Sequence, residues 1–134
     1  MYTAEIQVRV RYAETDRMGY VYYGNYATYF EVARVEALRN LGFSYRLLED
    51  RGILLPVMNY SVRYFKPAYY DDLLLIKTVI RKKPMASIHF SYEVFNEKDE
   101  RINEAETTLV FINRETNRPC PAPADFLEAI GKFF

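Results

Sequence analysis

The chain has 134 residues, half of them hydrophobic, which suits one domain spanning residues 1–134 with a single buried core. Its 18 basic and 18 acidic residues cancel, and neither sign forms a long block, so we expect no nucleic-acid partner and no membrane partner. The first residues show no signal-peptide pattern and no stretch is long enough to cross a bilayer, which predicts a cytoplasmic protein.

The first half of the chain is predicted to contain a strand, a long helix and a short helix. Apolar and polar residues alternate up to about Tyr12, as in a strand with one buried face. Apolar residues then recur at helical spacing from Asn25, a candidate cap, to Gly42, which predicts a helix of about 16 residues. The short helix is predicted over Ser44–Arg51. The charged residues of the long helix predict a solvated face with ion pairs: Glu31, Arg34, Glu36 and Arg39.

Four strands and a terminal helix are predicted to follow. Turn-forming residues separate the strands, and Asn96–Glu100 has the polar composition of a hairpin loop. We therefore expect a meander of neighbouring antiparallel strands. Apolar residues at helical spacing over 124–134 predict a helix that docks on the domain. The predicted strands are Leu54–Phe65, Leu73–Arg81, Ala86–Phe95 and Asn103–Asn113.

This order of elements indicates an α+β fold, with one antiparallel sheet wrapped over a single long helix. The chain also holds 13 Tyr and nine Phe but no Trp. So many aromatic rings exceed what one small sheet encloses, and we expect a homo-oligomer that buries some of them.

The chain offers few side chains for acid–base or nucleophilic catalysis, because His89 is its single histidine. It lies inside a predicted strand, on the face opposite to the apolar residues, and no Gly-x-Ser-x-Gly motif accompanies it. Cys120 is the one cysteine, so no disulfide, no metal site and no cofactor are predicted. A carboxylate remains, and Asp16 is the best placed, in a loop between a strand and a helix N-terminus.

The start of that helix supplies a second chemical feature. Backbone N–H groups of a first helical turn lack partners within the helix and lie at its positive dipole end, so they can hold an oxyanion. Here these groups belong to Tyr23, Gly24, Asn25 and Tyr26. Gly24 lets a carbonyl approach the main chain closely, although a turn would explain this glycine equally well.

Residues 12–26, YAETDRMGYVYYGNY, resemble the signature of the YbgC-like and 4-hydroxybenzoyl-CoA thioesterases. The spacing Asp-x-x-Gly-x-Val-x-x-x-x-Tyr is rather specific, and the likeness continues through 29–34, 56–57, 64–68 and 71–73, so it covers almost the whole chain. The resemblance implies a hotdog fold and a homodimer or homotetramer. It also implies that an acyl-CoA substrate binds at the subunit interface with its acyl group near Asp16.

The resemblance further implies the catalytic roles. Asp16 attacks the thioester carbonyl or activates a water molecule, and N–H groups near Tyr23 and Gly24 polarise the carbonyl. Tyr23 stands where the YbgC-like branch commonly has a histidine and the other branch has an aromatic residue. It removes a proton-transfer partner, which is harmless if only the N–H group of this residue acts.

Substrate-binding residues are implied in three places. Gly19, Asn25 and Tyr26 surround the loop and the helix start. Met58 and Asn59 match the strand that borders the acyl pocket, with core packing as the alternative for Met58. A basic turn lies near the position that meets the CoA phosphates, and an ordinary solvated turn is the alternative there. Its residues are Arg81, Lys82 and Lys83.

Two other functions compete with hydrolysis. A hotdog dehydratase or hydratase resembles its relatives in using a histidine with an acidic partner, and no histidine precedes His89. A non-catalytic module that binds acyl-CoA or an acyl carrier protein is the second alternative, and the intact Asp16 argues against it.

Overall fold

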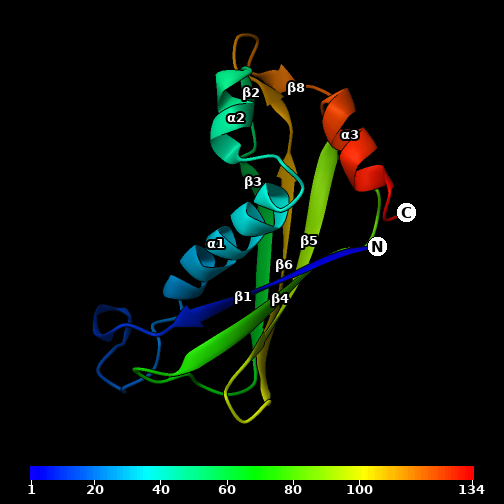
Figure 1. Cartoon of the computed structure of the whole chain (residues 1–134). Coiled ribbons are helices and arrows are strands. Elements are labelled where there is room, and N and C mark those ends of the chain that lie inside the picture. Colours follow the sequence, from blue (N-terminus) through cyan, green and yellow to red (C-terminus); the bar gives the residue numbers. More distant parts are fainter.

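The computed structural model describes residues 1–134, and its main sheet has five antiparallel strands in the order β1-β4-β5-β6-β3. The sheet curves around the long helix α1, Asn25–Arg39, as Figure 1 shows. The predicted α+β arrangement of one antiparallel sheet over one long helix is therefore confirmed. No helix has the length and apolar character needed to cross a membrane. The strands are β1 (Tyr2–Arg9), β3 (Val57–Tyr64), β4 (Leu73–Ile80), β5 (Ser87–Phe95) and β6 (Arg101–Val110).

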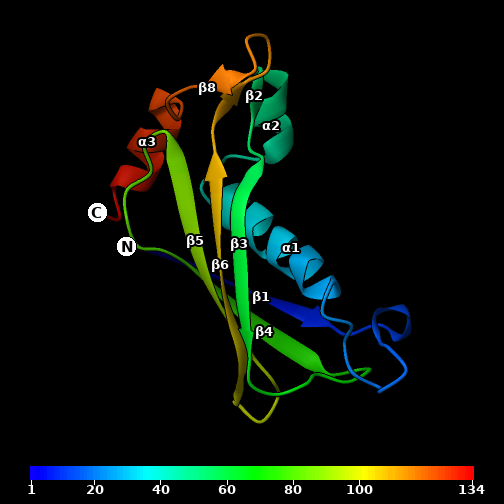
Figure 2. The same ribbon diagram turned by 180° about the vertical axis from the view of Figure 1, so that it is seen from behind.

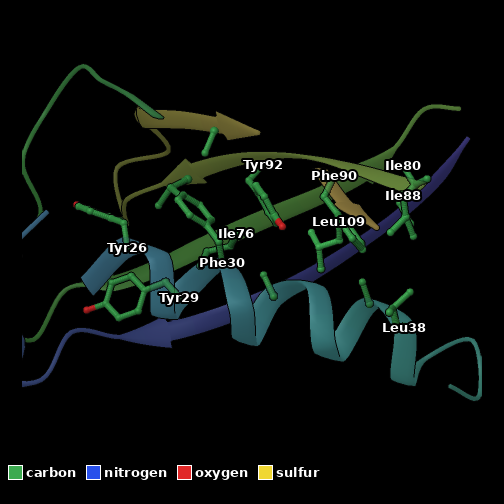
Figure 3. Close-up of a cluster of buried hydrophobic side chains, with 14 of the residues drawn as sticks. Tyr26, Tyr29, Phe30, Leu38, Ile76, Ile80, Ile88, Phe90, Tyr92 and Leu109 are labelled. Atoms are coloured by element: carbon green, nitrogen blue, oxygen red, sulfur yellow. The ribbon is translucent and has the colours of Figure 1, made fainter. Parts of the chain in front are cut away.

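The core lies between α1 and the concave face of this sheet (Figure 3). Buried residues alternate with half-exposed ones along β4 and β5, because successive side chains of a strand point to opposite faces. The ring of Phe30 on α1 packs 4.6 Å, centroid to centroid, from that of Tyr92 on β5. The helix and the sheet thus share one apolar core, which fixes the height and direction of α1 over the strands.

The predicted meander is correct for three strands and wrong for the fourth. β4, β5 and β6 are consecutive neighbours, and the loop over 96–100 joins β5 to β6 as expected. β3, however, pairs with β6 instead of β4 and forms an edge of the sheet. The chain between β3 and β4 therefore crosses from one edge strand to the other side of the sheet. Long-range pairing, which local sequence does not encode, decides this order.

The predicted strand over 54–65 is divided at Pro56. Proline has no N–H to donate to a strand ladder, and β3 begins only after it. The residues before it form β2, Ile53–Leu54, in a second sheet with β7, Ile112–Asn113, and β8, Arg118–Pro119. The predicted strand over 103–113 is likewise divided between β6 and β7.

The predicted helices are all present, with shifted ends. β1 ends at Arg9, three residues earlier than expected, and a 3₁₀ turn, η1 (Tyr12–Glu14), follows it. Gly24 takes the N-cap position of α1, so Asn25 is not the cap. The side-chain N–H of Asn25 instead donates to the Glu14 carbonyl at 2.8 Å. The other helices are α2 (Tyr45–Asp50), capped by Ser44, and α3 (Ala124–Gly131).

One prediction about the charged face of α1 is wrong. Arg39 and Glu36 form the expected ion pair, 3.2 Å apart, at the solvated C-terminal end of the helix. Arg34, in contrast, is only 7% exposed and forms no ion pair with Glu31. Its Nε donates to the hydroxyl of Tyr45 at 3.1 Å, because α2 packs close to this side of α1. Arg34 lies four residues from both Phe30 and Leu38, which are buried on the same face of α1, so the helical spacing itself places it on the buried side.

Candidate active site

The Asp16 loop lies beyond the end of β1 and next to the N-terminus of α1 (Figure 1). It closes as a tight turn in which the Asp16 N–H donates to the Tyr20 carbonyl at 2.8 Å and the Gly19 N–H donates to the Asp16 carbonyl at 3.0 Å. Gly19 has a φ of 83°, a backbone conformation that favours glycine. The loop geometry therefore depends on this glycine.

The carboxylate of Asp16 is held through one of its two oxygens. Oδ1 accepts hydrogen bonds from the main-chain N–H groups of Met18, at 2.9 Å, and Tyr20, at 3.2 Å. Oδ2 has no hydrogen-bond partner, and the side chain is half-buried. The two bonds fix the orientation of the carboxylate and leave the second oxygen available for chemistry.

Two of the four N–H groups predicted as oxyanion donors lack an acceptor. Asn25 donates to the Tyr22 carbonyl at 2.9 Å and Tyr26 donates to the Tyr23 carbonyl at 3.3 Å, whereas the N–H groups of Tyr23 and Gly24 make no hydrogen bond. Gly24 has a φ of −63°, which any residue adopts, so no turn demands glycine there. A Cβ at this position would lie 2.9 Å from the Tyr22 ring. A side chain at position 24 would therefore require the exposed Tyr22 ring to move.

Asp16 and Tyr23 line the same cavity, which has a volume of about 300 Å³. Its walls are mostly aromatic, and the rings of Tyr26 and Tyr64 lie 5.6 Å apart at their centroids. Burial, followed by the nearby Tyr64, raises the pKa of Tyr26 well above its ordinary value, so this phenol stays neutral. The cavity is lined by Asp16, Met18, Tyr20, Val21, Tyr23, Tyr26, Tyr64, Phe65, Lys66 and Pro67.

Glu14 connects the Asp16 loop to α1 through hydrogen bonds to its carboxylate and its main-chain carbonyl. Its buried carboxylate accepts hydrogen bonds from the Arg11 main chain (2.8 Å), the Arg11 guanidinium (2.8 and 3.2 Å) and the Tyr29 hydroxyl (2.8 Å). Its carbonyl accepts from the Tyr22 N–H, at 2.9 Å, and from the Asn25 side chain. Burial raises the pKa of Glu14, but the bonds from Arg11 and Tyr29 outweigh it, so the pKa lies below its usual value. An ionised Glu14 therefore braces the loop and the helix start together.

The structure brings together part of the site predicted from the sequence. Asp16, Tyr23 and Tyr26 line the cavity, whereas Gly24 does not line it, although its N–H is free and it follows Tyr23 directly in the chain. Gly19 and Asn25 shape the loop and the helix start but do not line the cavity. Sequence reasoning missed the cavity walls contributed by Met18, Tyr20, Val21 and the run Tyr64, Phe65, Lys66 and Pro67. The last run belongs to a segment that matched the family signature, and this was the signal that pointed to it.

Met58 and Asn59 lie near the start of β3, where the register with β6 shifts, and both are exposed. Neither lines the cavity, and Met58 is 65% exposed, so its alternative role in core packing is wrong. β3 does border the site through Tyr64, whereas Tyr60, four residues earlier on the same strand, lines a separate cavity.

The basic turn over 81–83 lies far from Asp16 within one chain. Tyr2 pairs with Ile80 at one end of β1, and Arg9 pairs with Leu73 at the other, next to the Asp16 loop. Eight strand residues therefore separate the turn from the loop, which is about 25 Å. The cation that does line the cavity is Lys66, which forms an ion pair with Glu100.

His89 lies on the sheet face away from α1, as predicted. Its Nε2 lies 3.6 Å from a carboxylate oxygen of Glu106 on β6, and its side chain is 42% exposed. It does not line the cavity beside Asp16. A mechanism that relies on histidine therefore has no support at this site.

An antiparallel sheet wrapped around one long helix defines the hotdog class of proteins. Residues 10–130 match the model of the thioesterase-like superfamily, and the chain belongs to this family. It is 34% identical over 116 residues to the acyl-CoA thioester hydrolase YbgC of Escherichia coli O157:H7, covering 87% of each protein.

Solved structures agree with this placement. A DHNA-CoA thioesterase from Staphylococcus aureus is 39% identical, with a TM-score of 0.94 over 99% of this chain and 91% of that one. A crystal structure of a 4-hydroxybenzoyl-CoA thioesterase shares the fold at 23% identity, with a TM-score of 0.87 over 96% of this chain and 99% of that one. The resemblance to thioesterases and the hotdog fold, both predicted from the sequence, are confirmed.

Proposed function

We propose that this chain is an acyl-CoA thioesterase that hydrolyses a CoA thioester to a free acid and CoA, with Asp16 as the reacting carboxylate. The observation that carries this proposal is the presence of two features at the start of α1, where Asp16 and Tyr23 line one cavity. Oδ2 of Asp16 is free while Oδ1 is held by two N–H groups, and the N–H groups of Tyr23 and Gly24 lack acceptors. A carboxylate and unpaired donors at a helix start are the groups that acyl transfer needs.

Two routes use the same groups. In the first, Oδ2 attacks the carbonyl carbon, the C–S bond breaks, CoA leaves as the thiolate, and water hydrolyses the resulting mixed anhydride. In the second, Oδ2 takes a proton from a water molecule, whose oxygen attacks the carbonyl carbon, and the proton then goes to the leaving sulfur. In both routes the carbonyl oxygen gains negative charge, and the Tyr23 and Gly24 N–H groups are the donors that stabilise it.

The surroundings support hydrolysis of an acyl group. The aromatic walls around Tyr26 and Tyr64 give an acyl group an apolar surface to bind. Glu14 holds the loop that carries Asp16 against the helix start that carries the donors. The names of the similar YbgC and Staphylococcus aureus proteins identify CoA thioesters as the substrate class.

We further infer that the chain works as a homodimer or homotetramer. β3 is an edge strand whose residues are exposed along almost its whole length, with Val57, Met58, Tyr60 and Tyr64 among its large apolar side chains. An exposed apolar edge pairs readily with another strand, and a second copy of the chain supplies one. The 81–83 turn lies about 25 Å from the Asp16 loop in one chain. A role for this turn in binding CoA phosphates therefore requires the second copy.

The test is free-thiol release from a panel of short-chain, long-chain and aromatic acyl-CoAs. Asp16→Asn removes the charge but keeps an Oδ1 that accepts from Met18 and Tyr20, so the loop stays folded. We expect kcat/KM to fall about 10²- to 10⁴-fold, with an unchanged Tm. Asp50→Asn, at the exposed end of α2, is the matched control. Equal turnover by Asp16→Asn and wild type would refute the role of Asp16.

Other outcomes separate the alternatives. Tight binding of acyl-CoA with no thiol release from any panel member would replace the proposal with a non-catalytic binding module. The same assay with an acyl carrier protein thioester shows whether the carrier is CoA alone. Rapid quenching of wild type during the first turnover, followed by mass analysis of the Asp16 peptide, distinguishes the two routes. An added acyl mass identifies Asp16 as the nucleophile.

A further inference from the structure

Arg34 is a buried cation that has no anionic partner in the chain. It is 7% exposed, and no carboxylate lies within 4 Å of its guanidinium. Burial lowers the pKa of Arg34, but the hydroxyls of Tyr45 and Tyr92 raise it, and the net pKa lies above the ordinary value. Arg34 is therefore charged, and a buried charge without a counter-ion is costly. Such a group is usually kept for a ligand or a function.

Arg34 lines a second cavity, of about 320 Å³, distinct from the one beside Asp16. Its Nε donates to Tyr45 and its guanidinium also meets the Tyr92 hydroxyl, but a guanidinium has five N–H donors, so others remain for a further acceptor. Thr107, buried on β6, lines the same cavity, and its hydroxyl lies 2.7 Å from that of Tyr92. This end of the cavity is polar, while Phe30 and Tyr60 supply aromatic walls.

The two cavities follow one another along the junction of α1 and β3, which lie side by side in Figure 2. Tyr26 and Tyr64 line the first cavity, and Phe30 and Tyr60, whose rings lie 6.2 Å apart, line the second. The rings of Tyr26 and Phe30 are stacked one helical turn apart, with centroids 6.3 Å apart. Nine helical residues separate the helix start from Arg34, which is about 14 Å along the axis. An acyl group that runs along α1 from the donors at the helix start thus points toward Arg34.

We propose that Arg34 binds a carboxylate at the end of the acyl group remote from the thioester. The favoured substrates are then CoA thioesters of acids that carry a second acidic group. This proposal rests on the proposed function and extends it to the acyl end. A guanidinium binds a carboxylate through paired N–H donors, and the low dielectric of a buried site strengthens that bond. Glu31 lines the same cavity but is exposed and not within ion-pair distance of Arg34, so it does not occupy the N–H donors of the guanidinium.

The test uses matched substrates: octanoyl-CoA against the CoA monothioester of octanedioic acid, and benzoyl-CoA against 4-carboxybenzoyl-CoA. The measured quantity is the ratio of kcat/KM for the carboxylated member to that for the neutral member. In wild type we expect the ratio to favour the carboxylated member of at least one pair. In Arg34→Met it should fall about 10- to 100-fold, the worth of hydrogen bonds to a charged group. Arg34→Lys keeps the positive charge but lacks the paired N–H donors of the planar guanidinium, so it should give an intermediate ratio.

Arg39→Met is the matched control, because Arg39 lies on the same helix, exposed and paired with Glu36. Its ratio should equal that of wild type. Two outcomes overturn the proposal: a wild-type ratio at or below one for both pairs, or an equal loss on both members in Arg34→Met. Equal loss together with dissociation of the oligomer, measured by light scattering, would show that Arg34 binds a carboxylate of a second copy instead. If Arg34→Met does not fold, the ratios measured for wild type and for Arg34→Lys decide whether the proposal holds.

A binding measurement separates this proposal from the proposed function. Calorimetric titration of wild type and Arg34→Met with monomethyl octanedioate and methyl octanoate needs no turnover, and these two esters differ only in the remote carboxylate. Wild type should bind monomethyl octanedioate at least tenfold more tightly than methyl octanoate, and Arg34→Met should lose this preference. If no acyl-CoA is hydrolysed, a retained preference for monomethyl octanedioate still supports the site. If hydrolysis holds and the preference is absent, the Arg34 site alone is refuted.

Discussion

The substitution Glu14→Gln tests most directly the hydrogen bonds that hold the Asp16 loop against α1. Glu14 is 7% exposed, and its Oε1 accepts from the Arg11 main-chain N–H and the Tyr29 hydroxyl, both at 2.8 Å. Its Oε2 accepts from the Arg11 guanidinium at 2.8 and 3.2 Å. Glutamine has nearly the same shape, but it has no charge and places an NH₂ donor where Oε2 accepts. The substitution therefore changes the electrostatics of the frame without leaving a cavity.

The loss of stability follows from the bonds that change. Both bonds to Oε1 pass from a charged acceptor to a neutral one, and each then loses about 1 kcal/mol. The Arg11 guanidinium is 75% exposed and screened by solvent, so its bonds are left out of the sum. The free energy of unfolding should thus fall by about 2 kcal/mol. For 134 residues this lowers Tm by about 7 °C.

The pH dependence gives an independent check. The pKa of Glu14 is lower in the folded protein than its usual value, which is about 4.3 in an unfolded chain. A lowered pKa contributes stability that is present above the unfolded pKa and is lost as the pH falls through the folded pKa. The Tm difference between wild type and Glu14→Gln should therefore be full above about pH 5 and shrink below about pH 4.

Thermal unfolding at one fixed protomer concentration measures both effects, because assembly makes Tm depend on concentration. Glu128→Gln, on the exposed face of α3, serves as the control and should leave Tm unchanged. A Tm difference below about 2 °C at pH 7, or one that does not change toward acid pH, would contradict the role assigned to Glu14.

Two further predictions concern the Asp16 loop and the helix start. Tyr23→Phe keeps the main-chain N–H, so kcat/KM for the best acyl-CoA should fall less than tenfold; a loss as large as that of Asp16→Asn would show that the hydroxyl acts in catalysis. Gly19→Ala meets no atom within 4 Å but must hold a φ of 83°, so calorimetry should show a loss of about 1–2 kcal/mol from backbone strain alone.

The repeating patterns of the sequence predicted most of the elements, because side-chain periodicity reports local backbone geometry. Alternation along β4 and β5 and helical spacing along α1 are local properties, and the structure has these elements close to the predicted ranges. The ends of the elements were predicted less accurately, since Pro56 divides one predicted strand and η1 shortens another. The scarcity of histidine in the sequence also left Asp16 as the main catalytic candidate before any contact was known.

Tertiary structure alone decided which residues surround Asp16 and which charges are buried. β3 reaches the cavity because it pairs with β6 at the sheet edge, so Tyr64 meets Tyr26 across nearly 40 positions of sequence. Arg34 was assigned to the solvated face because of its charge, yet it lies on the buried side of α1, between Phe30 and Leu38, and donates to Tyr45 of α2. Burial and pairing between distant segments depend on the packing of the whole chain, which no local pattern contains. The sequence by itself therefore determined the elements and singled out Asp16 as the candidate carboxylate, and the tertiary structure decided the cavity walls and the unpaired cation.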